Sequence, residues 1–353
     1  MIVTASARKI IMKGISFITR QEKAFKINMW RTSLQQFATM LTRQYESIYI
    51  MALGATPVHL GAVNGLGGLA GAISAILTGW SVDRYGLKKT FLFGTSFMAM
   101  GALLFALATN WIFAIPAVIV STLAAAVLNT ACPVVCGSCL DNKERATGMQ
   151  LCDTLSAAPA LIAPLIGAVI LTEFGGMNET GIRPLFFLQT VVICLTLTLI
   201  LKKFTNPKKR AIVATSDIKD GFQDVLKQGV TMKRWMLFYC FSVVPLFLTP
   251  VYVPLFAAEI KKTDQFVLGW MAASATMVPL LFSIPVGRLA GKIGRKKVMY
   301  LTIFIYCLSL LVLVFAPNSA VLIFSGVLQG FYTLGSVIRA AMTVELMPVQ
   351  LLG

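Results

Sequence analysis

The sequence predicts an all-α polytopic membrane protein with about ten transmembrane helices, and three observations lead to this fold class. Of the 353 residues, 57% are hydrophobic and only 13% are charged, about half the charged fraction of an ordinary globular domain. Several long runs contain no charged residue. Lys and Arg outnumber Asp and Glu by 31 to 14 and gather in the segments between those runs. This composition excludes a disordered chain and a typical soluble enzyme.

The charge-free runs locate the helices. Run 90–140 would form a helix of about 75 Å, far longer than the ~30 Å hydrocarbon core, so we expect it to fold back at Thr109 and Asn110. Gly and Pro place further turns in segments 53–59 and 316–319. We therefore predict ten helices, at approximately 30–53, 60–81, 90–109, 111–135, 148–171, 184–201, 236–257, 267–286, 298–315 and 320–341.

The distribution of basic residues predicts the topology. With the N-terminus inside, the segments expected in the cytoplasm hold 25 of the 31 Lys and Arg residues, whereas the outer loops hold Arg183, Lys261 and Lys262. This asymmetry is what the positive-inside rule requires. We expect a multi-pass protein of the plasma membrane with both termini cytoplasmic. Contact with the bilayer accounts for the net charge of +17, so we expect no nucleic-acid partner.

The helices divide into six and four, and a polar, basic stretch separates them. We expect a basic cytoplasmic N-terminal segment at 1–29 and a six-helix bundle at 30–201. A cytoplasmic linker at 202–234 would then lead to an incomplete C-terminal bundle at 235–353, with four helices. Only the linker is long and polar enough to join two domains.

One motif occurs twice at an offset of 208 residues: GWSVDRYGLKK (79–89) and GRLAGKIGRKK (287–297). A generic basic loop would explain the charges but not the shared glycine spacing, so the pair indicates an internal duplication. We expect both copies to form an inner gate. Its residues are Gly79, Asp83, Arg84, Gly86, Lys88 and Lys89 in the first copy, and Gly287, Lys292, Gly294, Lys296 and Lys297 in the second.

In these residues the chain resembles the major facilitator superfamily of secondary transporters. Segment 79–89 is similar to the family's G-x-x-x-D-R-x-G-R-R/K signature, with Leu87 in place of a basic residue, and ELMPVQLLG (345–353) is similar to its E-x-x-P-x-x-x-x-G element. The resemblance implies two helical bundles that rock about a central cavity. Members normally have twelve helices and this chain apparently lacks helices 11 and 12, so we favour a fragment over a natural ten-helix carrier.

Arg43 and Glu46 are the main candidates for contact with substrate or a coupling proton. Both lie near the middle of the first predicted helix, one turn apart. A charge at that depth costs several kcal/mol unless it is paired or faces water. The resemblance implies that this helix lines the cavity. A purely structural ion pair, or a first helix that lies partly outside the membrane, is an equally good interpretation.

Three neutral residues, Asn129, Gln329 and Tyr332, lie on helices that line the cavity in the family. The resemblance makes them substrate or proton candidates, although such residues more often form hydrogen bonds between helices. Asp153 is a candidate gate partner for Arg84 or Lys88, and a solvated carboxylate near the surface is the alternative.

No catalytic or metal site is apparent. Cys136 and Cys139 form a CxxC with Cys132 one turn earlier, but zinc requires four ligands and the only histidine, His59, lies across the membrane. The chain has no Walker sequence and no set of catalytic residues. We therefore expect neither a cofactor nor a metal, and no enzymatic activity.

We expect secondary active transport of a small-molecule substrate by alternating access. A monomer would carry out this transport, coupled to protons. Efflux of drug-like or amphipathic compounds is mildly preferred, and uptake of a metabolite is nearly as well supported. The alternative is a non-transporting fragment, or a membrane sensor or scaffold on the same fold.

Overall fold

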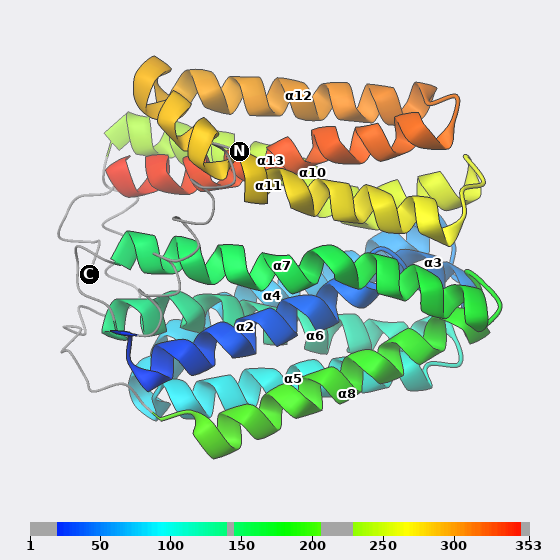
Figure 1. Ribbon diagram of the computed structural model, residues 1–353, viewed down its shortest axis with the longest axis horizontal. Coiled ribbons are helices and arrows are strands. Elements are labelled where there is room, and N and C mark those ends of the chain that lie inside the picture. Colours follow the sequence, from blue (N-terminus) through cyan, green and yellow to red (C-terminus); the bar gives the residue numbers. More distant parts are fainter. Residues whose placement is uncertain (1–19, 140–144, 206–228, 347–353) are drawn as a thin grey trace, which may run out of the picture. The chain divides into compact units, whose positions relative to one another are not determined.

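The computed structural model describes residues 20–139, 145–205 and 229–346, and every regular element in these ranges is a helix (Figure 1). The helices are α2 (Lys23–Thr42), α3 (Glu46–Ala52), α4 (Pro57–Tyr85), α5 (Leu87–Leu107), α6 (Trp111–Cys139), α7 (Arg145–Glu173), α8 (Glu179–Lys203), α10 (Gly229–Glu259), α11 (Gln265–Ile293), α12 (Arg295–Phe315) and α13 (Ser319–Leu346). Each predicted helix has its counterpart in this series, which confirms the all-α class. In the described residues, six helices are long and apolar enough to cross a membrane, and shorter apolar helical stretches lie at 247–259 and 319–335.

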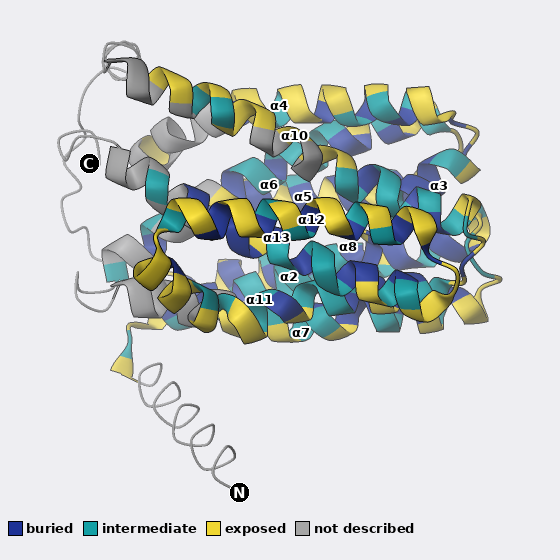
Figure 2. Ribbon diagram, turned by 90° about the horizontal axis from the view of Figure 1, so that it is seen from above, coloured by how far each residue is buried: buried dark blue, intermediate teal, exposed yellow. Residues whose placement is uncertain are grey.

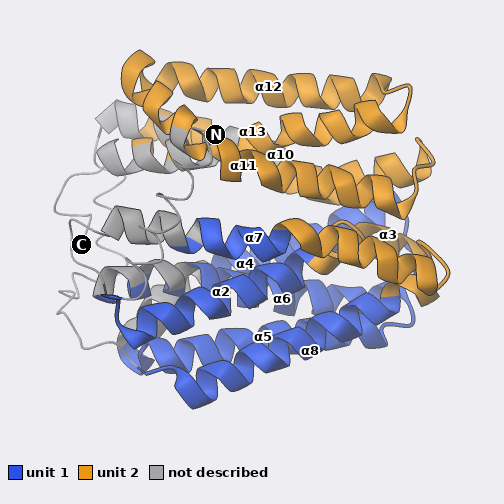
Figure 3. Ribbon diagram, viewed as in Figure 1, with its two compact units in different colours: residues 1–40, 53–160, 183–210 blue, residues 41–52, 161–182, 211–353 orange. Residues whose placement is uncertain are grey.

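The chain forms two compact units, coloured in Figure 3. Unit 1 comprises residues 1–40, 53–160 and 183–210, and unit 2 comprises residues 41–52, 161–182 and 211–353. In unit 1, α6 packs against α4 and α5; in unit 2, α13 packs against α11 and α12. Unit 2 also contains α3 and the second half of α7.

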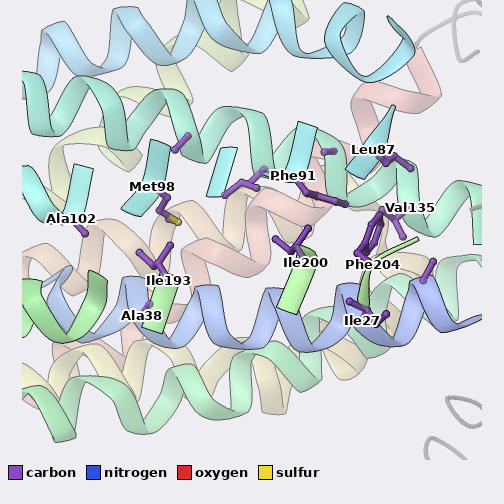
Figure 4. Close-up of a cluster of buried hydrophobic side chains, with 14 residues drawn as sticks. Ile27, Ala38, Leu87, Phe91, Met98, Ala102, Val135, Ile193, Ile200 and Phe204 are labelled. Atoms are coloured by element: carbon purple, nitrogen blue, oxygen red, sulfur yellow. The ribbon is translucent and has the colours of Figure 1, made fainter. Parts of the chain in front are cut away.

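The apolar core of unit 1 joins four helices, as Figure 4 shows. Phe91 and Leu87 of α5, Val135 of α6 and Ile200 of α8 are buried there, together with Ile27 of α2. The Phe91 ring meets the Phe204 ring edge-on at 5.3 Å between centroids. This interdigitation fixes α2 against α5, α6 and α8.

The outward faces of the helices are apolar rather than polar. Figure 2 shows the exposed positions along α12 in yellow. They recur three and four residues apart, so they form one face of the helix. They include Tyr300, Phe304, Leu308, Leu311 and Phe315. A long exposed apolar stripe suits contact with lipid, where it costs nothing.

The offset of 208 residues extends far beyond the repeated motif. Helices α4 and α11 both have 29 residues, and both ends of α11 lie 208 positions after those of α4. The same offset relates both ends of the 21-residue helices α5 and α12 and the starts of α6 and α13. Gly86 and Gly294 interrupt the two pairs with φ values of 78° and 94°, a region that favours glycine. These matching bounds confirm the predicted duplication.

Two equivalent contacts show that the duplicated helices pack alike. Where α6 crosses α4, the Thr122 hydroxyl donates to the Gly67 carbonyl oxygen at 2.9 Å. At the positions 208 residues later, Gly330 of α13 lies directly against Ala275 of α11, where an added Cβ would be 2.5 Å from the carbonyl oxygen. Small residues therefore allow the first and third helices of each repeat to approach closely.

Two cations predicted in the outer loops cap equivalent helices. Arg183 donates from Nη2 to the carbonyl oxygen of Ala108 at 2.8 Å, after the end of α5. Lys261 donates from Nζ to the carbonyl oxygens of Val314 at 2.6 Å and Ala316 at 3.1 Å, at the end of α12. Ala108 and Ala316 are again 208 positions apart. A cation at a helix C-terminus satisfies orphan carbonyls and complements the helix dipole.

Candidate functional site

The first predicted helix is not continuous. It ends as α2 at Thr42, passes through a turn at 43–45 and restarts as α3 at Glu46. The prediction of one helix over 30–53 is wrong at this point. The cause is tertiary, because this stretch contains no Gly or Pro and the turn is held by the fully buried Tyr45, whose hydroxyl bonds to the backbone of Gln265.

Arg43 and Glu46 flank this turn. Arg43 is exposed and Glu46 is partly buried, and an electrostatic attraction connects the carboxylate with the guanidinium. They therefore lie together, but at a helix break rather than one turn apart on a single helix. A carboxylate that lies next to a cation and is partly buried is chemically able to take up and release a proton.

Tyr332 belongs to a cluster of polar and aromatic side chains in unit 2. Its ring packs against the Tyr306 ring of α12 at 4.4 Å between centroids, and the guanidinium of Arg339 lies 4.6 Å from the Tyr332 ring centroid. Tyr306 forms a hydrogen bond with Thr249 of α10. Arg339 is only 2% exposed. The cluster presents a cation and two phenol rings, groups that bind aromatic or anionic compounds.

Sequence reasoning identified Tyr332 but not Arg339, Tyr306 or Thr249. A signal was present on α13, because Tyr332, Gly335 and Arg339 recur at helical spacing and share one face. Gln329, one turn before Tyr332, has a buried Nε2 atom with no hydrogen-bond partner in the described part of the chain.

Unit 1 contains a second buried guanidinium that sequence reasoning missed. Arg31 of α2 is 1% exposed. It donates to the side-chain oxygens of Asn28 at 3.1 Å, Gln35 at 2.5 Å and Thr32 at 3.1 Å, and lies 4.3 Å from the ring centroid of Phe91. The only sign of this hydrogen-bonded group in the sequence is its spacing, since Asn28 and Gln35 lie three and four residues from Arg31. Asn129, the candidate of unit 1, is exposed on α6.

The first copy of the motif connects α4 with α5. Lys88 donates from Nζ to the carbonyl oxygen of Leu201 at 3.2 Å, near the end of α8, while Lys89 is exposed. Arg84 is exposed and lies 5.8 Å from the Tyr85 ring centroid. Gly79 and Asp83 of α4 and Asp153 of α7 lie where the structure describes the helix but not the side chains. A pairing of Asp153 with Arg84 or Lys88 stays a prediction.

The second copy connects α11 with α12 in the same way. Lys292 and Lys297 are exposed, and Lys296 lies 5.9 Å from the Tyr300 ring centroid. A Cβ added to Gly287 would meet no atom within 4 Å. In both units the turn is thus a basic surface, and we call these turns the basic ends of unit 1 and unit 2.

The cysteine pattern gives no metal-ligand cluster in the described residues. Cys132 and Cys136 have side chains outside the description, whereas Cys139 is a free thiol at the end of α6. Burial, and then the neighbouring carboxylate of Glu22, raise the pKa of Cys139 to about 12. This thiol is therefore protonated at physiological pH.

Comparison with known proteins accounts for this arrangement. The sequence profile of the Major Facilitator Superfamily matches residues 32–264 and 247–353. The multidrug resistance protein MdtG of Enterobacter lignolyticus (strain SCF1) is 25% identical over 307 residues, covering 80% of this chain and 68% of that protein. MdtG of Salmonella choleraesuis (strain SC-B67) is 24% identical over 311 residues, covering 83% and 74%.

Solved structures share the fold at low identity. The nucleoside transporter NupG matches with a TM-score of 0.70 at 15% identity, covering 92% of this chain and 86% of that one. The D-xylose-proton symporter matches with a TM-score of 0.65 at 13% identity, covering 92% and 87%. The profile match spans nearly the whole chain and agrees with the duplicated helices, so this multi-pass membrane protein belongs to the Major Facilitator Superfamily of transporters.

Proposed function

We propose that this chain is a secondary active transporter that exports small amphipathic, drug-like compounds in exchange for protons. The observation that carries the proposal is Glu46, an acidic side chain placed beside Arg43 at the break between α2 and α3. These two helices together correspond to the first helix that the sequence predicts to cross the membrane. An intramembrane carboxylate is costly to maintain, and it commonly marks a proton or substrate pathway.

The proposed substrate class has two supports. The relatives at 24% and 25% identity are named multidrug resistance proteins. In unit 2, the packed rings of Tyr306 and Tyr332 offer aromatic stacking. These groups suit flat aromatic compounds and discriminate little among them, as a broad substrate range requires.

The proposed orientation follows from charge. In unit 1, Arg84, Lys88 and Lys89 lie next to the last residues of α8, Lys202 and Lys203. A basic end of this kind favours the cytoplasmic side. The basic ends would then face the cytoplasm, and the turns that contain Gly54, Asn110 and Asn318 would face outward.

The test measures export driven by a proton gradient in everted membrane vesicles. A fluorescent lipophilic cation such as ethidium serves as the probe, and Glu46→Gln is compared with the unaltered chain. The proposal predicts at least a tenfold loss of proton-driven transport, because the amide cannot exchange a proton. Glu259→Gln, which alters an exposed acid at the end of α10, should retain transport.

Two results would count against the proposal. Full transport by Glu46→Gln with an unchanged pH profile would exclude Glu46 as the coupling group. Absence of gradient-driven transport by the unaltered chain, although correctly inserted, would favour the non-transporting sensor or scaffold.

A further inference from the structure

The Tyr45 side chain connects three segments that are far apart in the sequence, all within unit 2. It is fully buried. Its hydroxyl donates to the carbonyl oxygen of Gln265, the first residue of α11, at 3.1 Å, and lies 3.4 Å from the carbonyl oxygen of Pro164 in α7. One phenol group therefore ties the start of α3 to α7 and α11.

Two further contacts join α7 and α11 close to Tyr45. Gln265 donates from Nε2 to the Thr172 hydroxyl at 2.9 Å. Gly269 of α11 faces α7 so closely that an added Cβ would be 3.1 Å from the Pro164 carbonyl oxygen and 3.5 Å from the Cβ of Ala168. We call Tyr45, Pro164, Thr172, Gln265 and Gly269 the Tyr45 junction.

The contacts of this junction are few and individually weak. Backbone carbonyls accept the Tyr45 hydroxyl, and one side-chain pair links Gln265 with Thr172 at a position where Thr172 is exposed. Next to it, the Gln44 side chain is only 6% exposed and forms a hydrogen bond with the Tyr45 side chain.

The junction also adjoins the proposed proton site. Tyr45 lies within the turn that separates Arg43 from Glu46, so a change at either charged group acts on the segment that holds the phenol. The turn is also where the chain passes from unit 1 into unit 2, since residues 41–52 belong to unit 2. A movement of this turn therefore alters the contact of α3 with α7 and α11.

We propose that Tyr45 is a latch: its hydroxyl holds α3, α7 and α11 together at the outer end, and its release opens this end to the solute. Tyr45 acts as a positioning residue, because it controls access rather than contacting the solute. The assignment of this end to the outside rests on the proposed orientation, whereas the latch itself depends only on the contacts within unit 2.

The size of the expected effect follows from the bonds. Tyr45→Phe keeps the buried ring and removes one hydroxyl, so the packing is retained and only the hydrogen bonding is lost. A hydrogen bond of this kind changes an equilibrium by about three- to tenfold. The open form of the junction should become more populated by that factor.

The experiment measures how often the junction opens. Ala168→Cys places a thiol at a fully buried position against Gly269, in a chain whose seven native cysteines are replaced by serine or alanine. A membrane-impermeant maleimide is added to intact cells, and its rate of reaction is determined. We expect labelling about three- to tenfold faster with Tyr45→Phe than with Tyr45. Tyr300→Phe, which alters an exposed tyrosine of α12 in the same unit, should leave the rate unchanged.

A second variant tests the latch independently of whether Tyr45→Phe folds. Thr172→Val removes the exposed hydrogen bond to Gln265 and should raise the rate about twofold. Equal labelling rates for Tyr45, Tyr45→Phe and Thr172→Val would overturn the latch. Labelling from the cytoplasmic side alone would overturn its outer placement. Because labelling requires neither solute nor a proton gradient, it distinguishes failure of the latch from failure of the proposed function.

Discussion

The crossing of α11 and α13 makes Gly330→Ala a sharp test of the duplicated helix packing. A Cβ at Gly330 would lie 2.5 Å from the Ala275 carbonyl oxygen and 2.6 Å from the Cβ of Val278. Neither atom is the free end of a flexible side chain. The helices must therefore separate to admit one methyl group.

The magnitude follows from two opposing effects. Overpacking of this kind costs about 1–3 kcal/mol, while the better helix propensity of alanine returns up to about 1 kcal/mol. We expect a net loss of about 1–2 kcal/mol in the free energy of unfolding. At about 2–4 °C per kcal/mol, the melting temperature should fall by several degrees.

Gly287→Ala is the matched control in the same unit. It lies inside α11, and its Cβ would meet no atom within 4 Å, so it should stabilise by up to about 1 kcal/mol. Both variants are purified in the same detergent, and thermal unfolding is followed by tryptophan fluorescence. A Gly330→Ala variant as stable as Gly287→Ala would refute the close crossing.

Two further predictions concern single side chains at helix ends. Lys261→Met removes the cation that caps α12 and should lower the free energy of unfolding by about 1 kcal/mol. The measurement compares its melting temperature with that of Lys262→Met, which alters an exposed lysine. Equal melting temperatures would contradict the cap. Since the pKa of Cys139 is raised to about 12, its thiol stays protonated at pH 8, and a permeant maleimide should react at least about 100-fold more slowly than with free cysteine. Glu22→Gln removes the nearby negative charge, lowers this pKa and should speed the reaction; mass spectrometry of the labelled peptide checks both rates.

The sequence was sufficient to place the helices because the relevant signals are local. Charge-free runs, the Gly and Pro residues between them and the length of a membrane span determine where α4 to α8 and α10 to α13 lie. The break in the first helix was not predictable, since no residue from 43 to 45 interrupts a helix by itself. It depends on Tyr45 reaching Gln265, 220 positions later.

The candidate site was predictable in part, for the same reason. Arg43, Glu46 and Tyr332 are conspicuous as polar residues within apolar runs. Arg339 is equally conspicuous, but its role depends on its contact with the Tyr332 ring and on the packing of that ring against Tyr306. Tyr306 comes from another helix. Partners that are supplied by tertiary packing leave no mark in the local pattern.

The proposed transporter moves a solute at the expense of a proton gradient. The most direct measurement uses purified protein in liposomes loaded with ethidium-binding nucleic acid, with a pH difference across the membrane as the sole energy source. We expect ethidium movement that depends on the gradient, disappears when a protonophore is added and is lost in Glu46→Gln. Ethidium movement that does not depend on the pH difference, or that is equally fast in liposomes without the protein, would contradict proton-driven transport.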